Sequence, residues 1–343
     1  MHKPKLQRIL VTGASGFLGS NVLKALLAQP DVEIIAACRT RAKLPPEFKG
    51  EVRIGDLVDA AYRREVVRDI DVICHTAAWA SMWSHAALER TRFFQPNIDL
   101  IEQAIQSGVK RFIQTSTVAI GKVQHDRSPH DDRSPTQSTG FWPHLDRLIE
   151  IDRYMQTNSH RGTQMITMRL GHFIGKGNRL GILPALVPRL RTYLVPWLAG
   201  GRKRMPLVAD TDMGNAFALA AVAENLNIYE SFNICGSAFP SMREVIDFIA
   251  AETGFPKPLF SVPYPAGYAF AWLMEKLHPV LPGSSPFLTR SIVHLSEDWL
   301  CPNDDAQRKL GYVPRKDWRT TVHEHLADLR VQGYPWPRLA QAI

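Results

Sequence analysis

A glycine-rich segment near the amino terminus has the residue types and spacing that hold a phosphate group. Gly13, Gly16 and Gly19 recur at every third position, directly after an apolar run that ends at Thr12. Such glycines permit a tight turn, a close approach of backbone to pyrophosphate, and close packing of the following helix, whose amino terminus faces the phosphate charge. The segment therefore predicts a dinucleotide site, with contacts from Thr12, Gly13, Ser15, Gly16, Phe17, Leu18 and Gly19.

The residue that follows the second apolar run indicates which dinucleotide is bound. A site for NAD usually places an acidic side chain about 20 residues after the glycines, where it accepts hydrogen bonds from the ribose hydroxyls. Arg39 stands at that position here, and Arg41 and Lys43 follow it. An arginine fork matches a 2′-phosphate in charge and in bidentate geometry. We therefore expect NADP(H) as the cofactor and regard NAD as less favoured.

Short apolar runs alternate with helical patterns around this turn. Strands are expected at 8–12, 33–38, 52–54, 71–75, 111–116, 165–170 and 232–235, and helices at 16–27, 61–69, 97–107, 145–157 and 242–253. Such alternation is typical of a parallel sheet covered on both faces, and right-handed crossovers make it doubly wound. The predicted fold class is α/β, a Rossmann-type doubly wound parallel sheet with a smaller, partly discontinuous C-terminal substrate domain.

The second half of the chain is richer in proline, tryptophan and short irregular segments. We expect an NADP-binding Rossmann domain at 1–175, to which a segment near 206–236 returns. The substrate-binding domain then comprises 176–205 and 237–343. The apolar stretch 264–277 could face lipid or a pocket, and ordinary core packing is the favoured interpretation.

The glycine spacing and several later motifs resemble the short-chain dehydrogenase/reductase superfamily, in its extended form. The motifs are Gly55-Asp56-Leu57, His75-Thr-Ala-Ala78, Asn97, Ser116-Thr-Val-Ala-Ile-Gly121, Arg169-Leu-Gly-His-Phe-Ile-Gly175, Phe232-Asn-Ile234 and Leu310-Gly-Tyr-x-Pro314. The resemblance covers nearly the whole chain. It is greatest to 3β-hydroxysteroid dehydrogenases, dihydroflavonol reductases and NAD-dependent sugar epimerases and dehydratases.

This resemblance implies further site residues. Asp56 and Leu57 would contact the adenine, Asn97 would support the active site, and Ser116 would hydrogen-bond the substrate oxygen, with Thr117 as the fallback. Other residues that it implies beside the cofactor are His75, Ala77, Ala78, Thr115 and His172. The implied reaction is reversible reduction of a carbonyl, or epimerisation through a transient ketone.

The tyrosine and lysine that this family uses for proton transfer are missing. The lysine, one helical turn after the tyrosine, lowers the tyrosine pKa and holds the ribose. No lysine occurs between Lys122 and Lys176, and the only Tyr-x-x-x-Lys, Tyr312 to Lys316, lies in the C-terminal signature. Two ungapped alignments remain open: one places His144, Leu148 and Asp152 in the tyrosine, lysine and glutamate positions, and the other places Trp142, Asp146 and Glu150 there. Pro143 fits the first alignment better, because proline is favoured at helix starts.

Three interpretations of this region stay open. His144 could act as a substitute acid, since the ordinary pKa of histidine is close to neutral. Arg147 could instead contact cofactor or substrate and supply positive charge. Alternatively, His144 only begins a helix, and the protein binds NADP(H) without turning it over, as a regulatory or partner-binding protein.

The substrate pocket is expected where the C-terminal domain covers the carboxyl edge of the strands. Trp79, Ser81, Met82 and Trp83 would line one side of it, and His172 and Phe173 the other. Aromatic and apolar lining suggests a bulky substrate that is sterol-like, flavonoid-like or nucleotide-sugar-like.

The overall composition narrows the possible partners, metals and location of the protein. The net charge of +8 comes from scattered basic residues without a nucleic-acid motif, so we expect no nucleic-acid partner. The four cysteines lack metal or redox spacing, and no apolar run reaches the length of a membrane span. We see no signal peptide and expect a cytoplasmic protein without metal, and a homodimer by analogy with the family.

Overall fold

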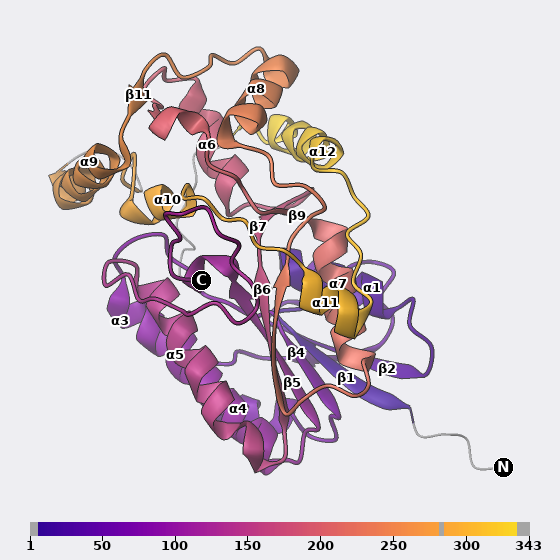
Figure 1. The fold of residues 1–343 in the computed structure, drawn as a ribbon. Helices are drawn as coiled ribbons and strands as arrows, with labels where there is room; N and C mark the ends of the chain where they lie inside the picture. The colour runs from indigo at the N-terminus through magenta and orange to yellow at the C-terminus, as the bar shows by residue number, and fades with distance from the viewer. Residues whose placement is uncertain (1–5, 281–284, 335–343) are drawn as a thin grey trace.

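The computed structural model describes residues 6–280 and 285–334. Its centre is a parallel sheet of seven strands in the order β10-β6-β5-β4-β1-β2-β3 (Figure 1). The strands are β1 (Gln7–Thr12), β2 (Val32–Cys38), β3 (Glu51–Ile54), β4 (Val72–His75), β5 (Arg111–Thr117), β6 (Gln164–Leu170) and β10 (Tyr229–Ile234). The strand order reverses direction between β1 and β4, as in a doubly wound fold. The predicted Rossmann-type fold is confirmed.

Helices cover both faces of this sheet because its strands are apolar on both sides. Ile9 and Val11 of β1 pack into one core, and the intervening Leu10 packs into the other. One face carries α1 (Phe17–Leu26) and α7 (Asp210–Val222). The other carries α2 (Ala60–Val66), α4 (Gln95–Gln106) and α5 (Pro143–Asn158). Full burial on two faces explains the continuous apolar runs in the sequence.

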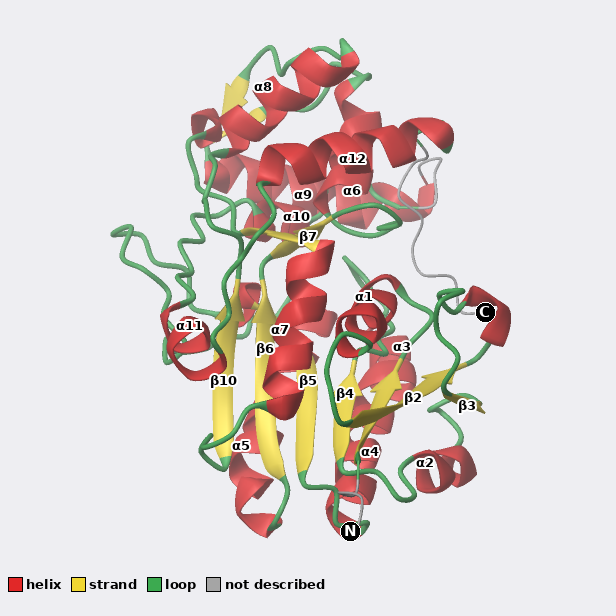
Figure 2. Ribbon diagram, turned by 90° about the vertical axis from the view of Figure 1, so that its right-hand side faces the viewer, coloured by secondary structure: helices red, strands yellow, loops and turns green. Residues whose placement is uncertain are grey.

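A second unit lies above the carboxyl ends of the strands (Figure 2). It has its own core, built mainly by α6 (Ile182–Leu190), α8 (Met242–Thr253) and α12 (Trp318–Val331). The short strands β7 (His172–Ile174) and β9 (Leu207–Ala209) pair beneath it, and β8 (Trp197–Leu198) pairs with β11 (Ser261–Val262). The remaining helices of this half are α9 (Tyr264–Leu277), α10 (Arg290–Leu295) and α11 (Asp304–Leu310).

Short helical segments complete the described chain. The stretch α3 (Ala86–Glu89) runs through a π-helical segment, η2 (Arg90–Phe94), into α4. Single 3₁₀ turns are η1 (Arg41–Lys43), η3 (Val118–Ile120), η4 (Ser159–Arg161), η5 (Ala199–Gly201) and η6 (His278–Val280).

The C-terminal half is not confined to the upper unit. Ala306, Leu310 and Tyr312, in and just after α11, pack in the same core as α1 and α7. Trp299 and Cys301 pack in the core on the opposite face of the sheet. The chain therefore returns to the Rossmann sheet around 299–312, in addition to the return near 206–236.

Helix α9 departs from the expectation of ordinary core packing. Only Gly267 and Ala271 of this helix are buried, whereas Phe270, Trp272 and Leu273 are 47%, 48% and 43% exposed. The expectation was wrong because apolar content alone does not say which neighbour covers a helix. Among the described residues, no helix combines the length and apolar character needed to cross a bilayer.

The turn after β1 is constrained by its contact with the end of β4. Gly13 has a φ of +66°, and a Cβ placed on it would lie 2.7 Å from the backbone N of Ala77. A Cβ on Gly19 would lie 2.2 Å from the Gly13 carbonyl oxygen. Both glycines are therefore needed for the backbone to approach this closely.

We expect Gly13→Ala to destabilise the protein more than Gly108→Ala, which has the same kind of backbone but open space around it. Gly108 has a φ of +71° with nothing within 4 Å of the added Cβ. The left-handed conformation alone should cost about 1 kcal/mol at either site, and displaced backbone should add about 2 kcal/mol or more at Gly13. Urea unfolding of both variants measures the difference. Equal losses would contradict the contact between the turn and β4.

Candidate active site and cofactor site

The start of α1 fits a phosphate group. Gly16 is its N-cap in extended backbone, and no side chain caps the helix amino terminus. The Gly16 N–H donates to the Gly13 carbonyl at 2.8 Å, which closes the turn. Ser15, Phe17 and Leu18 are half-buried and Gly16 is exposed. Uncapped helix N–H groups beside a backbone without Cβ atoms form the cradle that a pyrophosphate requires.

Three predicted cofactor residues hold the central strands together. The Thr12 hydroxyl and His75 Nδ1 are 2.7 Å apart, and the Thr115 hydroxyl donates to the His75 carbonyl at 2.8 Å. Burial lowers the pKa of His75 to about 4 because the charged imidazolium is poorly solvated there, although Asn97 acts in the opposite direction. The structure thus gives these side chains partners within β1, β4 and β5, below the glycine turn.

The other predicted cofactor contacts lie around the same edge. The Ala77 backbone packs against Gly13, and Ala78 is exposed beside it. Asp56 follows β3 and is exposed, with its Oδ1 accepting from the Val58 N–H at 3.0 Å. Leu57 packs against the core on the α2 side. These positions surround the carboxyl edge at β1, β4 and β3.

The basic group predicted to select the cofactor is exposed at the end of β2. Arg39 follows this strand directly, and Arg41 and Lys43 lie exposed in η1. The Ala14 N–H donates to the Ala37 carbonyl at 3.1 Å, so the end of β2 is tied to the glycine turn. Arg39 therefore lies within two residues of the strand position that contacts the turn.

Ser116 lies near the carboxyl end of β5, opposite Arg169 of β6. Its side chain is buried, and its hydroxyl has no hydrogen-bond partner within the described part of the chain. The neighbouring Thr117 differs, because its hydroxyl accepts from the Ala119 N–H at the start of η3. A buried hydroxyl without a hydrogen-bond partner is uncommon unless a ligand or a water molecule forms the missing hydrogen bond.

A buried carboxyl group contacts a histidine at the start of α5. Pro143 begins the helix, and His144 Nδ1 lies 3.1 Å from the Glu89 carboxylate. Glu89 is fully buried and also accepts from the Ser81 N–H at 2.9 Å. The Trp142 indole N–H donates to the Ser81 carbonyl at 2.7 Å. An ionised carboxylate can only accept a hydrogen bond, so with an ionised Glu89 this contact needs the proton on His144 Nδ1.

The remaining residues of the two alternative alignments face different ways. Leu148 is buried, and Asp152 is buried against β6, where it accepts from the Thr167 hydroxyl at 2.6 Å and lies 3.3 Å from Arg169. Asp146 instead accepts from the Thr139 N–H at 2.8 Å, and Glu150 pairs with Arg147. The alignment with His144 thus places its second and third positions on the buried face of α5.

Two residues near this site carry no sequence signal. Glu89 belongs to no motif, and only its burial beside His144 distinguishes it. His294 of α10 is buried, and its Nε2 lies 3.0 Å from the Ala119 carbonyl, next to the Ser116 segment. Its ring also meets that of Trp142 edge-on at 6.3 Å. The long sequence separation hides both contacts from any local pattern.

Arg147 points away from this group. It pairs with Glu150 on its own helix, and its guanidinium lies 5.1 Å from the centre of the Phe94 ring. Tyr312 and Lys316 are also apart from it. The Tyr312 hydroxyl donates to the buried Cys235 carbonyl, and Lys316 pairs with Asp210 and Glu324.

The expected substrate side combines half-buried aromatic residues with buried polar ones. Trp79, Met82 and Trp83 are half-buried. The Trp83 ring lies 4.6 Å from that of His278 in the upper unit, and Phe173 lies 6.1 Å from Phe17. His172 is buried and its Nε2 lies 2.9 Å from the Leu295 carbonyl, so it connects β7 to α10. Burial lowers its pKa to about 4.

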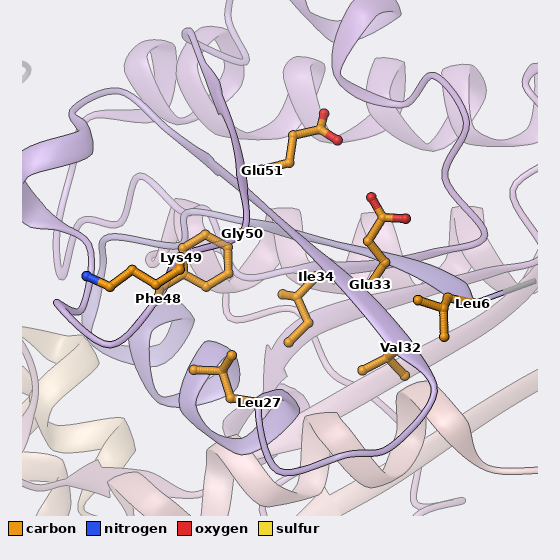
Figure 3. Close-up of a pocket in the computed structure, with 9 residues that line it drawn as sticks. All are labelled: Leu6, Leu27, Val32, Glu33, Ile34, Phe48, Lys49, Gly50 and Glu51. Carbon is orange, nitrogen blue, oxygen red and sulfur yellow. The ribbon is translucent and has the colours of Figure 1, made fainter.

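An open pocket of about 380 Å³ lies elsewhere, at the amino ends of β2 and β3. Its lining residues are Leu6, Leu27, Val32, Glu33, Ile34, Phe48, Lys49, Gly50 and Glu51 (Figure 3). Since ligands of open α/β sheets bind at the carboxyl ends, it does not belong to the cofactor site. Among residues 6–280 and 285–334, no group of three or more His, Cys, Asp or Glu side chains is arranged to hold a metal ion.

The comparisons with known proteins agree with this geometry. The model of the NAD-dependent epimerase/dehydratase family matches residues 9–235, which include the glycine turn, Ser116 and α5. The chain belongs to this family. The match covers the central sheet, and the family is one of NAD-dependent enzymes; the match does not distinguish NAD from NADP.

Several curated relatives match most of the length of this chain. A 3β-hydroxysteroid dehydrogenase/Δ5→4-isomerase of Mycobacterium tuberculosis is 33% identical and covers 80% of this chain and 82% of its own. A 4-hydroxy-2-methyl-3-oxo-4-farnesyl-3,4-dihydroquinoline-1-oxide ketoreductase of Stigmatella aurantiaca is 24% identical, and the match covers 95% of this chain and 96% of the relative. The solved structure of the dTDP-glucose 4,6-dehydratase of Streptomyces venezuelae shares the fold with a TM-score of 0.70. The two sequences are 20% identical, and the match covers 96% of this chain and 99% of the dehydratase.

The lowered pKa values of His75 and His172 predict a loss of stability in mild acid. Each has a pKa of about 4 in the folded protein against 6.5 ordinarily, so the unfolded chain binds more protons between these values. Stability is therefore full above about pH 6.5 and falls as the pH drops toward 4, by about 2 kcal/mol per histidine between pH 7 and 5. Urea unfolding at both pH values should show that His172→Gln removes about 2 kcal/mol of this difference.

The matched control for this measurement is His160→Gln, because His160 is exposed. We expect the control to keep the pH dependence of the unmodified protein. An unchanged pH dependence in His172→Gln would show that His172 is not held neutral in the fold.

Proposed function

We propose that the protein is an NADP(H)-dependent oxidoreductase that interconverts a carbonyl and a hydroxyl group on a bulky small molecule. The observation that carries this proposal is the pairing of His144 with the buried Glu89, at the helix start where the family has its proton donor. Ser116, near the carboxyl end of β5, contributes a buried hydroxyl that has no hydrogen-bond partner among the described residues. Together they supply a hydrogen-bond donor and a proton carrier for one substrate oxygen.

The cofactor would lie across the glycine turn, with its pyrophosphate on the amino terminus of α1. When bound, it supplies the hydride that is exchanged with the substrate carbon. Arg39 would pair with the 2′-phosphate, and the exposed Arg41 and Lys43 add positive potential at the same edge. The described end of β2 offers no acidic side chain to a ribose hydroxyl, which supports NADP(H) over NAD.

The Arg39→Ala variant tests this preference. Loss of a charge-assisted, bidentate contact should weaken NADPH binding roughly 10- to 100-fold and leave NADH binding unchanged. Titration calorimetry with both cofactors measures this. Arg153→Ala, an exposed arginine on the outer side of α5, is the matched control and should bind both as before. Tighter binding of NADH than of NADPH by the unmodified protein would contradict the proposal.

His144 and Ser116 would both act on the substrate oxygen, in different roles. Ser116 donates a hydrogen bond that stabilises negative charge as the carbonyl accepts hydride. His144 then gives the proton on Nε2 to that oxygen, and solvent restores it. Glu89 acts as a positioning residue, because its carboxylate orients the ring through Nδ1. In the reverse direction, the same nitrogen accepts the hydroxyl proton.

We expect turnover to depend on all three side chains while cofactor affinity does not. His144→Asn and Ser116→Ala should each lower kcat about 100-fold or more, and Glu89→Gln about 10-fold. NADPH oxidation across a panel of apolar ketones measures turnover, and NADPH titration measures binding. Glu150→Gln, on the outward side of α5, should leave both unchanged. A His144→Asn variant with full activity would remove this residue from the mechanism.

The substrate class follows from the lining and from relatives. Trp79, Met82 and Trp83 offer aromatic and apolar surface beside the carboxyl edge. The M. tuberculosis relative is named for a hydroxysteroid, and the S. aurantiaca relative for a farnesylated quinoline ketone. These observations favour a sterol-like or similarly apolar molecule over a nucleotide sugar.

A second candidate is a catalytically impaired NADP(H)-binding protein with a regulatory or partner-binding role. Leu148, which is buried one helical turn after His144, favours it because leucine supplies no charge to the cofactor ribose. Tight NADPH binding with no turnover by any ketone or alcohol would support this candidate. We also propose a cytoplasmic location, which suits four free, buried cysteines, and a homodimer by family analogy, which sedimentation would test.

A further inference from the structure

The outward face of α9 is apolar along its whole length. Eight residues of this helix are exposed: Pro265, Ala266, Ala269, Phe270, Trp272, Leu273, Lys276 and Leu277. Seven are apolar and the eighth is a cation. A helix on a water-facing surface ordinarily presents charged and polar residues outward, so this pattern is reversed. Val280, just beyond the helix, is 79% exposed and extends the same apolar character.

The opposite face of α9 packs on β8, on α10 and on the segment just before α5. A Cβ on Gly267 would contact Leu198 and Val293, and the Tyr268 ring meets that of Phe141 at 6.0 Å. Glu275 pairs with Arg290 of α10 at 2.8 Å, so the acidic group of the helix is turned inward. The helix is therefore held firmly on one side, and α9 projects at the edge of the molecule (Figure 1).

The chemistry of this face selects one kind of partner. Trp272 and Lys276 are adjacent on the helix surface, and both side chains suit a boundary between lipid and water because each has an apolar body and a polar end. The exposed face carries no carboxylate, and the chain has a net charge of +8, so an anionic surface attracts it. Acidic phospholipid provides both the apolar layer and the negative charge.

A second copy of the chain fits this face less well. A helix of 14 residues is about 21 Å long and about 10 Å wide, so its face covers about 210 Å², far below the roughly 800 Å² that each partner buries in a stable interface. The same dimensions are sufficient for a helix that lies in the plane of a membrane interface. We propose that α9 docks the protein on anionic phospholipid bilayers, with Phe270, Leu273 and Leu277 inserted among the acyl chains.

Flotation with vesicles of phosphatidylglycerol and phosphatidylcholine tests the proposal without any measurement of activity. We expect the protein to float with anionic vesicles and to bind phosphatidylcholine alone less tightly. A double variant, Phe270→Gln with Leu273→Gln, should lower the partition coefficient at least roughly 10-fold, because it removes two inserted side chains. Glutamine keeps helix propensity close to that of leucine, so α9 should stay folded.

Matched controls separate this face from exposed apolar residues in general. Ile228 and Val331 are 61% and 88% exposed and lie outside α9. The double variant Ile228→Gln with Val331→Gln should partition like the unmodified protein. Lys276→Gln should weaken binding to anionic vesicles about fivefold and leave binding to phosphatidylcholine unchanged. Brominated acyl chains should quench tryptophan fluorescence in the unmodified protein more than in Trp272→Phe.

Three outcomes would overturn the proposal. The first is that the protein stays with the buffer at every lipid concentration. The second is that both double variants lose binding equally, which would show that vesicle binding is not specific to α9. The third is that the unmodified protein is a dimer by sedimentation velocity and the double variant Phe270→Gln with Leu273→Gln is a monomer. That result would show that the exposed face of α9 binds a second copy of the chain. None depends on whether the active site turns over.

Discussion

The close approach of the Gly13 turn to the end of β4 is the contact on which the rest of the molecule depends. Neither Gly13 nor Gly19 has room for a Cβ, because Ala77 and the Gly13 carbonyl occupy that space. The Thr76 hydroxyl donates to the Thr12 carbonyl at 2.6 Å and fixes the same junction. This contact sets the start of α1 above β1 and β4, and it places uncapped N–H groups at the carboxyl edge where a dinucleotide belongs.

The chemistry that we propose for the site depends on the residues at the positions where the family resemblance expects a tyrosine and a lysine. At the start of α5, a buried carboxylate and an imidazole pair with each other, and a leucine fills the next turn of the helix. A buried carboxylate is tolerated only with hydrogen-bond donors around it, which Ser81 and His144 supply for Glu89. The need to satisfy Glu89 therefore also holds His144 in one orientation. A catalytic imidazole requires the same restraint.

The upper unit links this site to the outer surface through a short series of contacts. His294 meets the Ala119 carbonyl and the Trp142 ring, and α9 rests on Phe141 beside them. The same helix exposes its apolar side. One packed element thus connects the proposed reaction of an apolar molecule with the proposed attachment to a lipid surface.

The sequence by itself determined the fold class, the seven strands of the central sheet and the glycine turn, because periodicity and glycine spacing are local properties of the chain. It also indicated the missing tyrosine and lysine. It did not predict α7, which covers one face of the central sheet. It could not identify Glu89 or His294, because both meet the site through contacts between residues far apart in the chain. Nor could it show that Thr12 and Thr115 each hydrogen-bond to His75, or that α9 turns its apolar residues outward. Apolar content says that a segment avoids water, and only tertiary packing decides which neighbour, if any, covers it.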